Sequence, residues 1–202
     1  MKLPFHREPQ KPKDSFKIMH TEANSAEVLA DRISEVLRQI PAHRPIVLIC
    51  VGTDRSTGDS LGPLVGTQLK KYNIQGLHLY GTLDHPVHAM NLNDTLTIVH
   101  QHYNNPFIIA VDACLGQLTS VGCIQLGSGP VKPGAGVNKE LPPVGDIHVT
   151  GIVNVGGFME YFVLQNTRLS LVMSMAEVIS KSFYDAMSGL KRWTATSLAR
   201  ID

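Results

Sequence analysis

The sequence has few cysteines, almost no net charge and no long apolar run, and each shortage excludes a class of protein. Its three cysteines, Cys50, Cys114 and Cys123, form no CxxC pair, which favours reduced core thiols over a disulfide framework. A net charge of +1 gives no electrostatic reason to expect nucleic acid or an anionic membrane as a partner. No apolar stretch approaches the roughly 20 residues that span a bilayer, and the polar start of the chain lacks the core of a secretory signal. We therefore expect a cytoplasmic protein with no direct nucleic-acid or membrane partner.

Several common catalytic motifs are also missing. The chain has no G-x-G-x-x-G or G-x-x-x-x-G-K-[ST] loop for phosphates, no G-x-S-x-G elbow and no H-E-x-x-H pair. Nucleotide binding, serine hydrolase chemistry and a standard zinc peptidase therefore have no support. Cys114 follows an acidic residue closely enough to be a candidate nucleophile, but a small core thiol is the simpler interpretation.

The pattern along the chain predicts one α/β domain over residues 23–190. Residues 1–22 contain Pro4, Pro9 and Pro12 among charges, which predicts a flexible N-terminal arm. Residues 191–202 carry little pattern and are expected to form a C-terminal tail. The domain should begin with a helix near Asn24, where Asn24 and Glu27 have the spacing of a capping box.

Within this domain, apolar strand-like runs alternate with amphipathic helical stretches. This order is typical of right-handed βαβ units, so we expect a mixed but largely parallel sheet with helices on both faces. The connection from Asp112 to the strand at 121–126 is short, which predicts that this strand is antiparallel. The expected strands are 46–51, 77–80, 107–111, 121–126 and 147–155, and the expected helices lie at 24–40, 61–72, 92–103, near 158 and at 168–187.

Two acidic residues follow two of these strands, and they are the leading candidates for catalysis. Asp59 lies in the loop after the strand at 46–51, and Asp112 follows the strand at 107–111 directly. Ligands bind at the carboxyl ends of parallel strands, so neighbouring strands would bring both acids into one crevice. There the pair could share a proton, activate a water or hold a divalent cation. For Asp59 alone, a helix N-cap is an equally simple interpretation.

Other residues in the same predicted loops are candidates for substrate binding. Glycines permit close approach of the backbone to a ligand, and the long segment 127–146 is of a length that usually serves a function. Histidines near the strand ends could line the crevice or join the acids at a metal, although a lone histidine is usually structural. The candidates are Gly52, Gly58, Asp84, His85, His88, Gly134, Asn138 and His148.

Three sequence blocks resemble a known family. Residues 51–63, ending in Asp59-Ser60-Leu61-Gly62-Pro63, are similar to the glycine loop of the spore germination protease. Residues 109–113 are similar to its I-A-I-D-A block, and residues 133–140 to its P-G-S-G-V-G-N-K stretch. The chain thus resembles the sporulation proteins related to that protease. The first two blocks also resemble hydrogenase-maturation endopeptidases, which have a G-D-[DE]-G loop and a V-D-A block.

The resemblance implies a three-layer αβα sandwich of the phosphorylase/hydrolase-like type. It also implies an atypical aspartic peptidase that needs no cofactor, with Asp59 and Asp112 as its catalytic carboxylates. It implies a protein substrate, with small acid-soluble spore proteins as the natural candidates, a location in the forespore or spore core, and a homo-oligomer as one option. His88 or His148 would stand in for the histidine ligand of the hydrogenase endopeptidases. Two alternatives stay open, namely an inactive module that binds a peptide or cation and a small-molecule hydrolase, because fold does not imply function.

Overall fold

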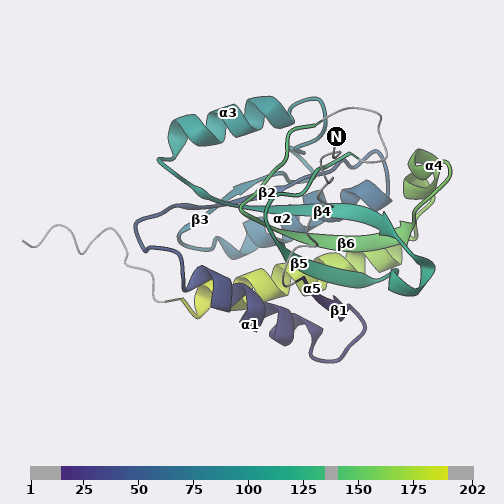
Figure 1. Cartoon of the computed structure of the whole chain (residues 1–202), viewed down its shortest axis with the longest axis horizontal. Coiled ribbons are helices and arrows are strands. Elements are labelled where there is room, and N and C mark those ends of the chain that lie inside the picture. Colours follow the sequence, from purple (N-terminus) through teal and green to yellow (C-terminus); the bar gives the residue numbers. More distant parts are fainter. Residues whose placement is uncertain (1–14, 135–140, 191–202) are drawn as a thin grey trace, which may run out of the picture.

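The apolar runs of the sequence form the centre of a six-stranded sheet that lies between two layers of helices (Figure 1). The computed structural model describes residues 15–134 and 141–190. Strand order across the sheet is β1-β5-β6-β4-β2-β3. The pairs β2–β3, β2–β4 and β4–β6 are parallel, whereas β5–β6 and β1–β5 are antiparallel. The strands are β1 (Phe16–Met19), β2 (Ile46–Cys50), β3 (Leu77–Tyr80), β4 (Phe107–Gly116), β5 (Cys123–Ser128) and β6 (Ile147–Val155).

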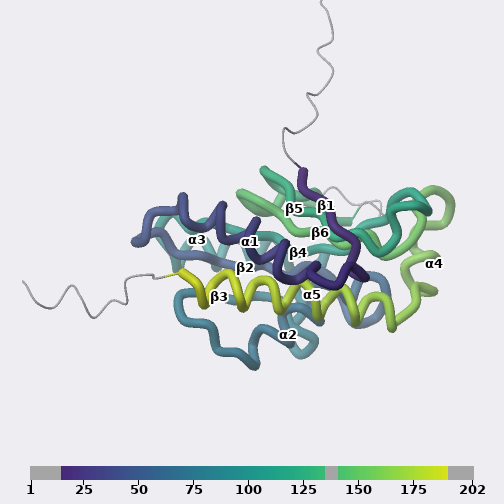
Figure 2. The backbone as a smooth tube through the Cα atoms, turned by 90° about the horizontal axis from the view of Figure 1, so that it is seen from below, coloured from purple at the N-terminus to yellow at the C-terminus, as the bar shows by residue number. Residues whose placement is uncertain are grey.

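Helices cover both faces of this sheet. On one face α1 and α5 pack side by side (Figure 2), and α2 packs against α5. On the other face lies α3 (Figure 1). The helices are α1 (Ser25–Leu37), α2 (Leu61–Tyr72), α3 (Leu92–His102), α4 (Glu160–Gln165) and α5 (Leu169–Ser188), with short 3₁₀ turns at Gly58–Ser60 and Leu118–Ser120. The predicted three-layer sandwich with a mixed sheet is confirmed.

The central strand β2 shows why its sequence is apolar without a break. Successive side chains of a strand point to opposite faces. Leu48 therefore packs with the core under α1, α2 and α5, while Val47 and Ile49 pack with the core under α3. All five residues of β2 are buried. A strand with helices on both sides has no solvent-facing row, so it carries no polar alternation.

Two features near the start of the described chain differ from the prediction. Phe16–Met19 lies within the arm assigned to residues 1–22, yet it forms β1, paired antiparallel with β5. Four residues are too few for a periodic signal, and their strand conformation depends on the partner strand. Asn24 does precede α1, but it makes no side-chain cap hydrogen bond, so the predicted capping box is wrong although the helix is confirmed.

β4 is also longer than predicted. It continues through Asp112 to Gly116, and its pairing with β6 shifts register between Cys114 and Leu115. Asp112 therefore lies inside the strand and not at its end. The five additional residues are only partly buried, so they lack the apolar pattern by which the first half was recognised. None of the helices in residues 15–134 and 141–190 is long and apolar enough to cross a membrane.

Candidate active site

The two acids reach one place because their strands are neighbours. β2 and β4 pair in parallel with Cys50 opposite Val111, and the amide of Val51 donates to the carbonyl of Val111 at 2.7 Å. Asp112 therefore lies beside the point where the chain leaves β2. Asp59 returns to this point from the loop that follows, in the 3₁₀ turn Gly58–Ser60.

Gly52 allows that loop to fold back on itself. Its φ is +146°, and a Cβ at this position would lie only 2.0 Å from the carbonyl oxygen of Asp59. The amide of Thr53 donates to the same oxygen at 3.1 Å. Only a residue without a side chain fits here, so Gly52 fixes the position of the turn that carries Asp59. This is a backbone role, and it accompanies the lining role predicted for this glycine.

Asp59 and Asp112 line the same cavity, of about 810 Å³. The lining comes from the loop after β2, from Asp112 in the middle of β4, from the loop at 88–90, from residues 133, 134 and 141, and from α4. Of the predicted residues, Gly52, His88 and Gly134 line it together with the acids. The other lining residues are Val51, Thr53, Arg55, Ser56, Ala89, Met90, Pro133, Leu141, Tyr161 and Leu164.

Burial holds both carboxyls toward their protonated forms. Desolvation raises the pKa of Asp112 well above its usual range, and the nearby charge of Asp59 raises it further. A hydrogen bond of 2.9 Å from the amide of Ala113 to Asp112 Oδ1 opposes this rise. Desolvation also raises the pKa of Asp59, and the Ser56 hydroxyl counteracts it. The two acids therefore titrate as a coupled pair in which Asp112 retains a proton more readily.

Asp59 is not the capping residue of a helix. Neither the 3₁₀ turn nor α2 begins with a side-chain cap hydrogen bond, and α2 starts after Ser60. The helix-cap interpretation of Asp59 is therefore wrong. Its carboxylate lies partly exposed in the cavity, where it can act on a bound molecule.

Ser56 is a site residue that the sequence prediction missed. It is only 4% exposed, and its Oγ is the single buried side-chain nitrogen or oxygen without a hydrogen-bond partner in the described part of the chain. The hydroxyl acts on the pKa of Asp59 without reaching hydrogen-bond geometry. A buried hydroxyl without a partner is costly, so the position of Ser56 beside Asp59 is maintained at the expense of stability. The sequence signal that could have identified Ser56 is its position in the loop between Gly52 and Asp59.

The remaining predicted residues lie elsewhere. Asp84 and His85 are exposed and line a neighbouring cavity of about 580 Å³, which shares His88 with the first. The ring of His148 bonds through Nδ1 to the carbonyl of Gly129 at 2.9 Å and does not line the acid cavity. Gly58 is buried under α4, where a Cβ would meet Leu164 at 2.8 Å. Asn138 lies outside the described residues.

His88 has a defined orientation at the rim of the cavity. The amide of Met90 donates to His88 Nδ1 at 3.2 Å, and the amide of His88 donates to Asn91 Oδ1 at 2.8 Å. An Nδ1 that accepts a hydrogen bond places the ring proton on Nε2. The described residues contain no group of three or more His, Cys, Asp or Glu side chains that could hold a metal ion. The divalent cation considered between the two acids therefore stays a prediction.

The cysteine near the acids remains a thiol. Burial raises the pKa of Cys114 to about 11, so its sulfur is protonated at neutral pH. A protonated thiol is a poor nucleophile. The interpretation of Cys114 as a core thiol agrees with this environment.

The fold has a counterpart among solved protein structures. It is similar to the NiFe hydrogenase maturation protease HycI from Thermococcus kodakarensis KOD1, with a TM-score of 0.50 and 15% identity over 78% of this chain and 99% of that one. Residues 17–182 match the family described as protein of unknown function DUF1256, and the chain belongs to that family. It is also 58% identical over 164 residues to the uncharacterized protein YyaC of Bacillus subtilis (strain 168), covering 81% of this chain and 80% of YyaC.

These matches bear on the family expected from the sequence. The resemblance to hydrogenase-maturation endopeptidases is confirmed at the level of the fold. The descriptions of the matched family, relative and structure mention neither the spore germination protease nor sporulation. The sporulation role therefore stays a prediction.

Proposed function

We propose that the protein is an endopeptidase in which Asp59 and Asp112 together activate a water molecule. The observation that carries this proposal is the pair of carboxyls in one cavity, with the pKa of Asp112 raised both by burial and by the charge of Asp59. Two acids whose environments push their pKa values apart can act as base and acid in one reaction. The peptidase-like fold supports the same reaction class.

The proposed step assigns one role to each acid. The Asp59 carboxylate takes a proton from water, and the resulting hydroxide attacks the carbonyl carbon of the scissile amide. Protonated Asp112 gives its proton to the departing nitrogen as the C–N bond breaks. The Ser56 hydroxyl lowers the pKa of Asp59 and so favours its ionised form, which is the form that acts as the base. Transfer of the new proton from Asp59 to Asp112 after the product leaves then restores the starting state.

The proposed substrate is a protein, and no step requires a metal ion. The cavity of about 810 Å³ is large enough for several side chains of a polypeptide. Its walls include apolar side chains such as Leu141 and Leu164 and the cation of Arg55. On the sequence resemblance, small acid-soluble spore proteins are the first substrates to examine.

Direct cleavage tests the proposal. The pure protein would be incubated with small acid-soluble spore proteins and with a proteome-derived peptide library, in chelator or with added divalent cations, and the products read by mass spectrometry. Asp59→Asn and Asp112→Asn should each lower turnover by about a thousandfold. Asp54→Asn changes an exposed acid in the same loop and should leave turnover unchanged. Saturable binding of peptides without any cleavage would instead identify a binding module.

A further inference from the structure

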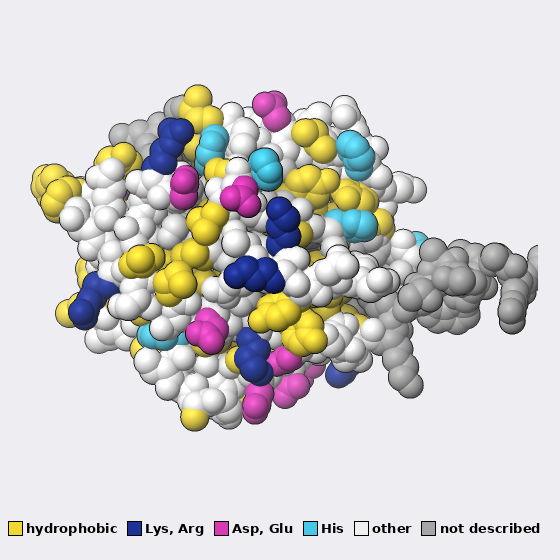
Figure 3. Space-filling view, turned by 180° about the vertical axis from the view of Figure 1, so that it is seen from behind, with side chains coloured by type: hydrophobic (Ala, Val, Ile, Leu, Met, Phe, Trp, Pro, Cys, Tyr) yellow, Lys and Arg dark blue, Asp and Glu magenta, His cyan; other side chains and the backbone are white. Residues whose placement is uncertain are grey.

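A group of large apolar side chains is exposed around α4. Phe158 is 88% exposed, and Met159, Tyr161 and Phe162 are each more than half exposed. We call these four residues the α4 surface. Hydrophobic side chains gather at the edge of the molecule where α4 lies, which is on the right in Figure 1 and on the left in Figure 3. Exposed apolar side chains in such a cluster usually mark a place where another molecule binds.

α4 is held firmly to the domain by its opposite side. Leu164 is buried and packs over Gly58, in the turn that carries Asp59. Asn154 on β6 donates from Nδ2 to the carbonyl of Val163 at 3.3 Å and to Thr167 Oγ1 at 3.2 Å. The orientation of α4 is therefore set by contacts with the sheet and with the acid-bearing turn, and that orientation leaves the α4 surface facing outward.

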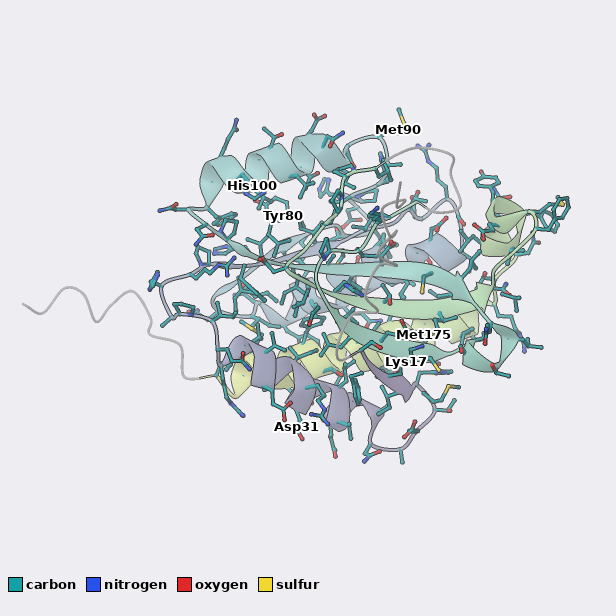
Figure 4. All side chains as sticks on the ribbon, viewed as in Figure 1. Lys17, Asp31, Tyr80, Met90, His100 and Met175 are labelled. Atoms are coloured by element: carbon teal, nitrogen blue, oxygen red, sulfur yellow. The ribbon has the colours of Figure 1, made fainter. Side chains whose placement is uncertain are left out.

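The α4 surface is continuous with the acid cavity. Tyr161 belongs to this surface and also lines the cavity, as does Leu164 from the same helix. Met90 also lines the cavity, is 73% exposed and projects away from the sheet (Figure 4). A substrate polypeptide with one residue bound at the two acids would therefore contact apolar side chains where it leaves the cavity.

The chemistry of this surface indicates an apolar occupant. Aromatic rings and methionine bind apolar side chains of varied shape. The nearby carboxylate of Glu160 accepts a hydrogen bond from the amide of Gly157 at 3.2 Å, within the turn that starts α4. Glu160 is the one charged residue between Phe158 and Phe162, and it is only partly exposed, so apolar side chains form most of this surface.

We propose that the α4 surface binds an apolar stretch of the polypeptide substrate next to the scissile bond. This proposal rests on the proposed peptidase function, whose substrate it describes more closely. The protein would then prefer chains that have a run of apolar residues beside the cleavage site and are unfolded there, because a folded substrate buries such a run.

Peptide binding to the full-length Asp59→Asn variant, which should not cleave, tests the proposal. The probes are two fluorescein-labelled peptides of equal length, one entirely polar and one with a central block of leucine and phenylalanine, read by fluorescence anisotropy. The apolar peptide should bind more tightly, and Phe158→Ser with Phe162→Ser should weaken it about tenfold or more. Ile98→Ser removes another exposed apolar side chain, which lies on α3, and should change nothing.

Equal binding of the two peptides, or equal binding by the double variant, would overturn the α4 proposal. Cleavage by the wild-type protein distinguishes the two proposals. If the double variant cleaves with unchanged kcat/KM, the peptidase stands and the α4 surface has no part in substrate binding. If binding depends on α4 and nothing is cleaved, the peptidase is wrong and the docking surface stands. A dimer that the double variant converts to monomer, with peptide binding unchanged, would identify a second copy as the occupant.

Discussion

Replacing Asp112 by asparagine should stabilise the protein at neutral pH while abolishing its activity. Burial raises the pKa of Asp112 in the folded state, and the charge of Asp59 adds to this. In an unfolded chain an aspartate has a pKa of about 3.9, so the folded state holds this proton more tightly than the unfolded state. Stability must therefore fall as the pH rises above about 4, because ionising Asp112 costs the folded state more.

The asparagine side chain introduced by Asp112→Asn has nearly the same shape as the aspartate and never ionises. It can also keep the acceptor for the amide of Ala113, which bonds to Asp112 Oδ1 at 2.9 Å. Relative to wild type, the variant should gain about 2 kcal/mol at neutral pH, which is the order of the penalty for a poorly solvated polar group. For a chain of this size that corresponds to about 6 °C in Tm. Below about pH 4, where Asp112 is protonated in both states, the two proteins should be equally stable.

Thermal unfolding followed by circular dichroism, from about pH 3 to about pH 8 at constant ionic strength, would measure this difference. A matched control is Asp31→Asn, since Asp31 is exposed on the outer side of α1 (Figure 4) and should show no gain that grows with pH. The reasoning is refuted if Asp112→Asn is no more stable than wild type at neutral pH, or if its gain is the same at every pH. Either result would mean that the Asp112 carboxylate is well solvated or paired.

Two further substitutions examine the loop that carries Asp59. Ser56→Ala removes a buried hydroxyl without a partner, so activity should fall while the free energy of unfolding stays equal or rises by about 1 kcal/mol. Its control is Ser60→Ala, because the Ser60 hydroxyl donates to the carbonyl of Thr57 at 2.7 Å. Urea unfolding should show that this control loses about 1 kcal/mol of stability. A stability loss for Ser56→Ala would show that its hydroxyl is satisfied. Gly52→Ala should cost about 3 kcal/mol and most of the activity, because its Cβ would clash with the Asp59 carbonyl. Gly76→Ala, at φ +78° with open space around it, should cost only about 1 kcal/mol, and equal losses would contradict the clash.

The acid pair could be predicted from the sequence because the signal is local. The apolar runs that became β2 and the first half of β4 mark two buried parallel strands, and Asp59 and Asp112 come soon after each run. Adjacent parallel strands bring such residues together. The glycine at position 52 was recognised for the same reason, since it immediately follows the first run. Its particular contact with the Asp59 carbonyl depends on how the loop closes and has no signature of its own.

The wall formed by α4 could not be predicted in the same way. Tyr161 and Leu164 lie far after Asp59 in the chain, and they reach the cavity only because α4 packs on the turn containing Gly58. β1 likewise depends on its pairing with β5. His148 was expected to line the acid cavity and does not, because a side chain on a strand can point to either face of the sheet. Its hydrogen bond to Gly129 decides its position.

The sequence by itself determined the α/β class, the order of the elements and the two acids. These features follow from hydrophobic period and from the short distance between each acid and its strand. Only the tertiary structure decided that Asp112 lies inside a strand, that Ser56 is left without a partner and that α4 extends the cavity as an apolar surface. The physical reason is that burial, desolvation and shared cavities depend on contacts between segments far apart in the chain, and local patterns do not specify those contacts.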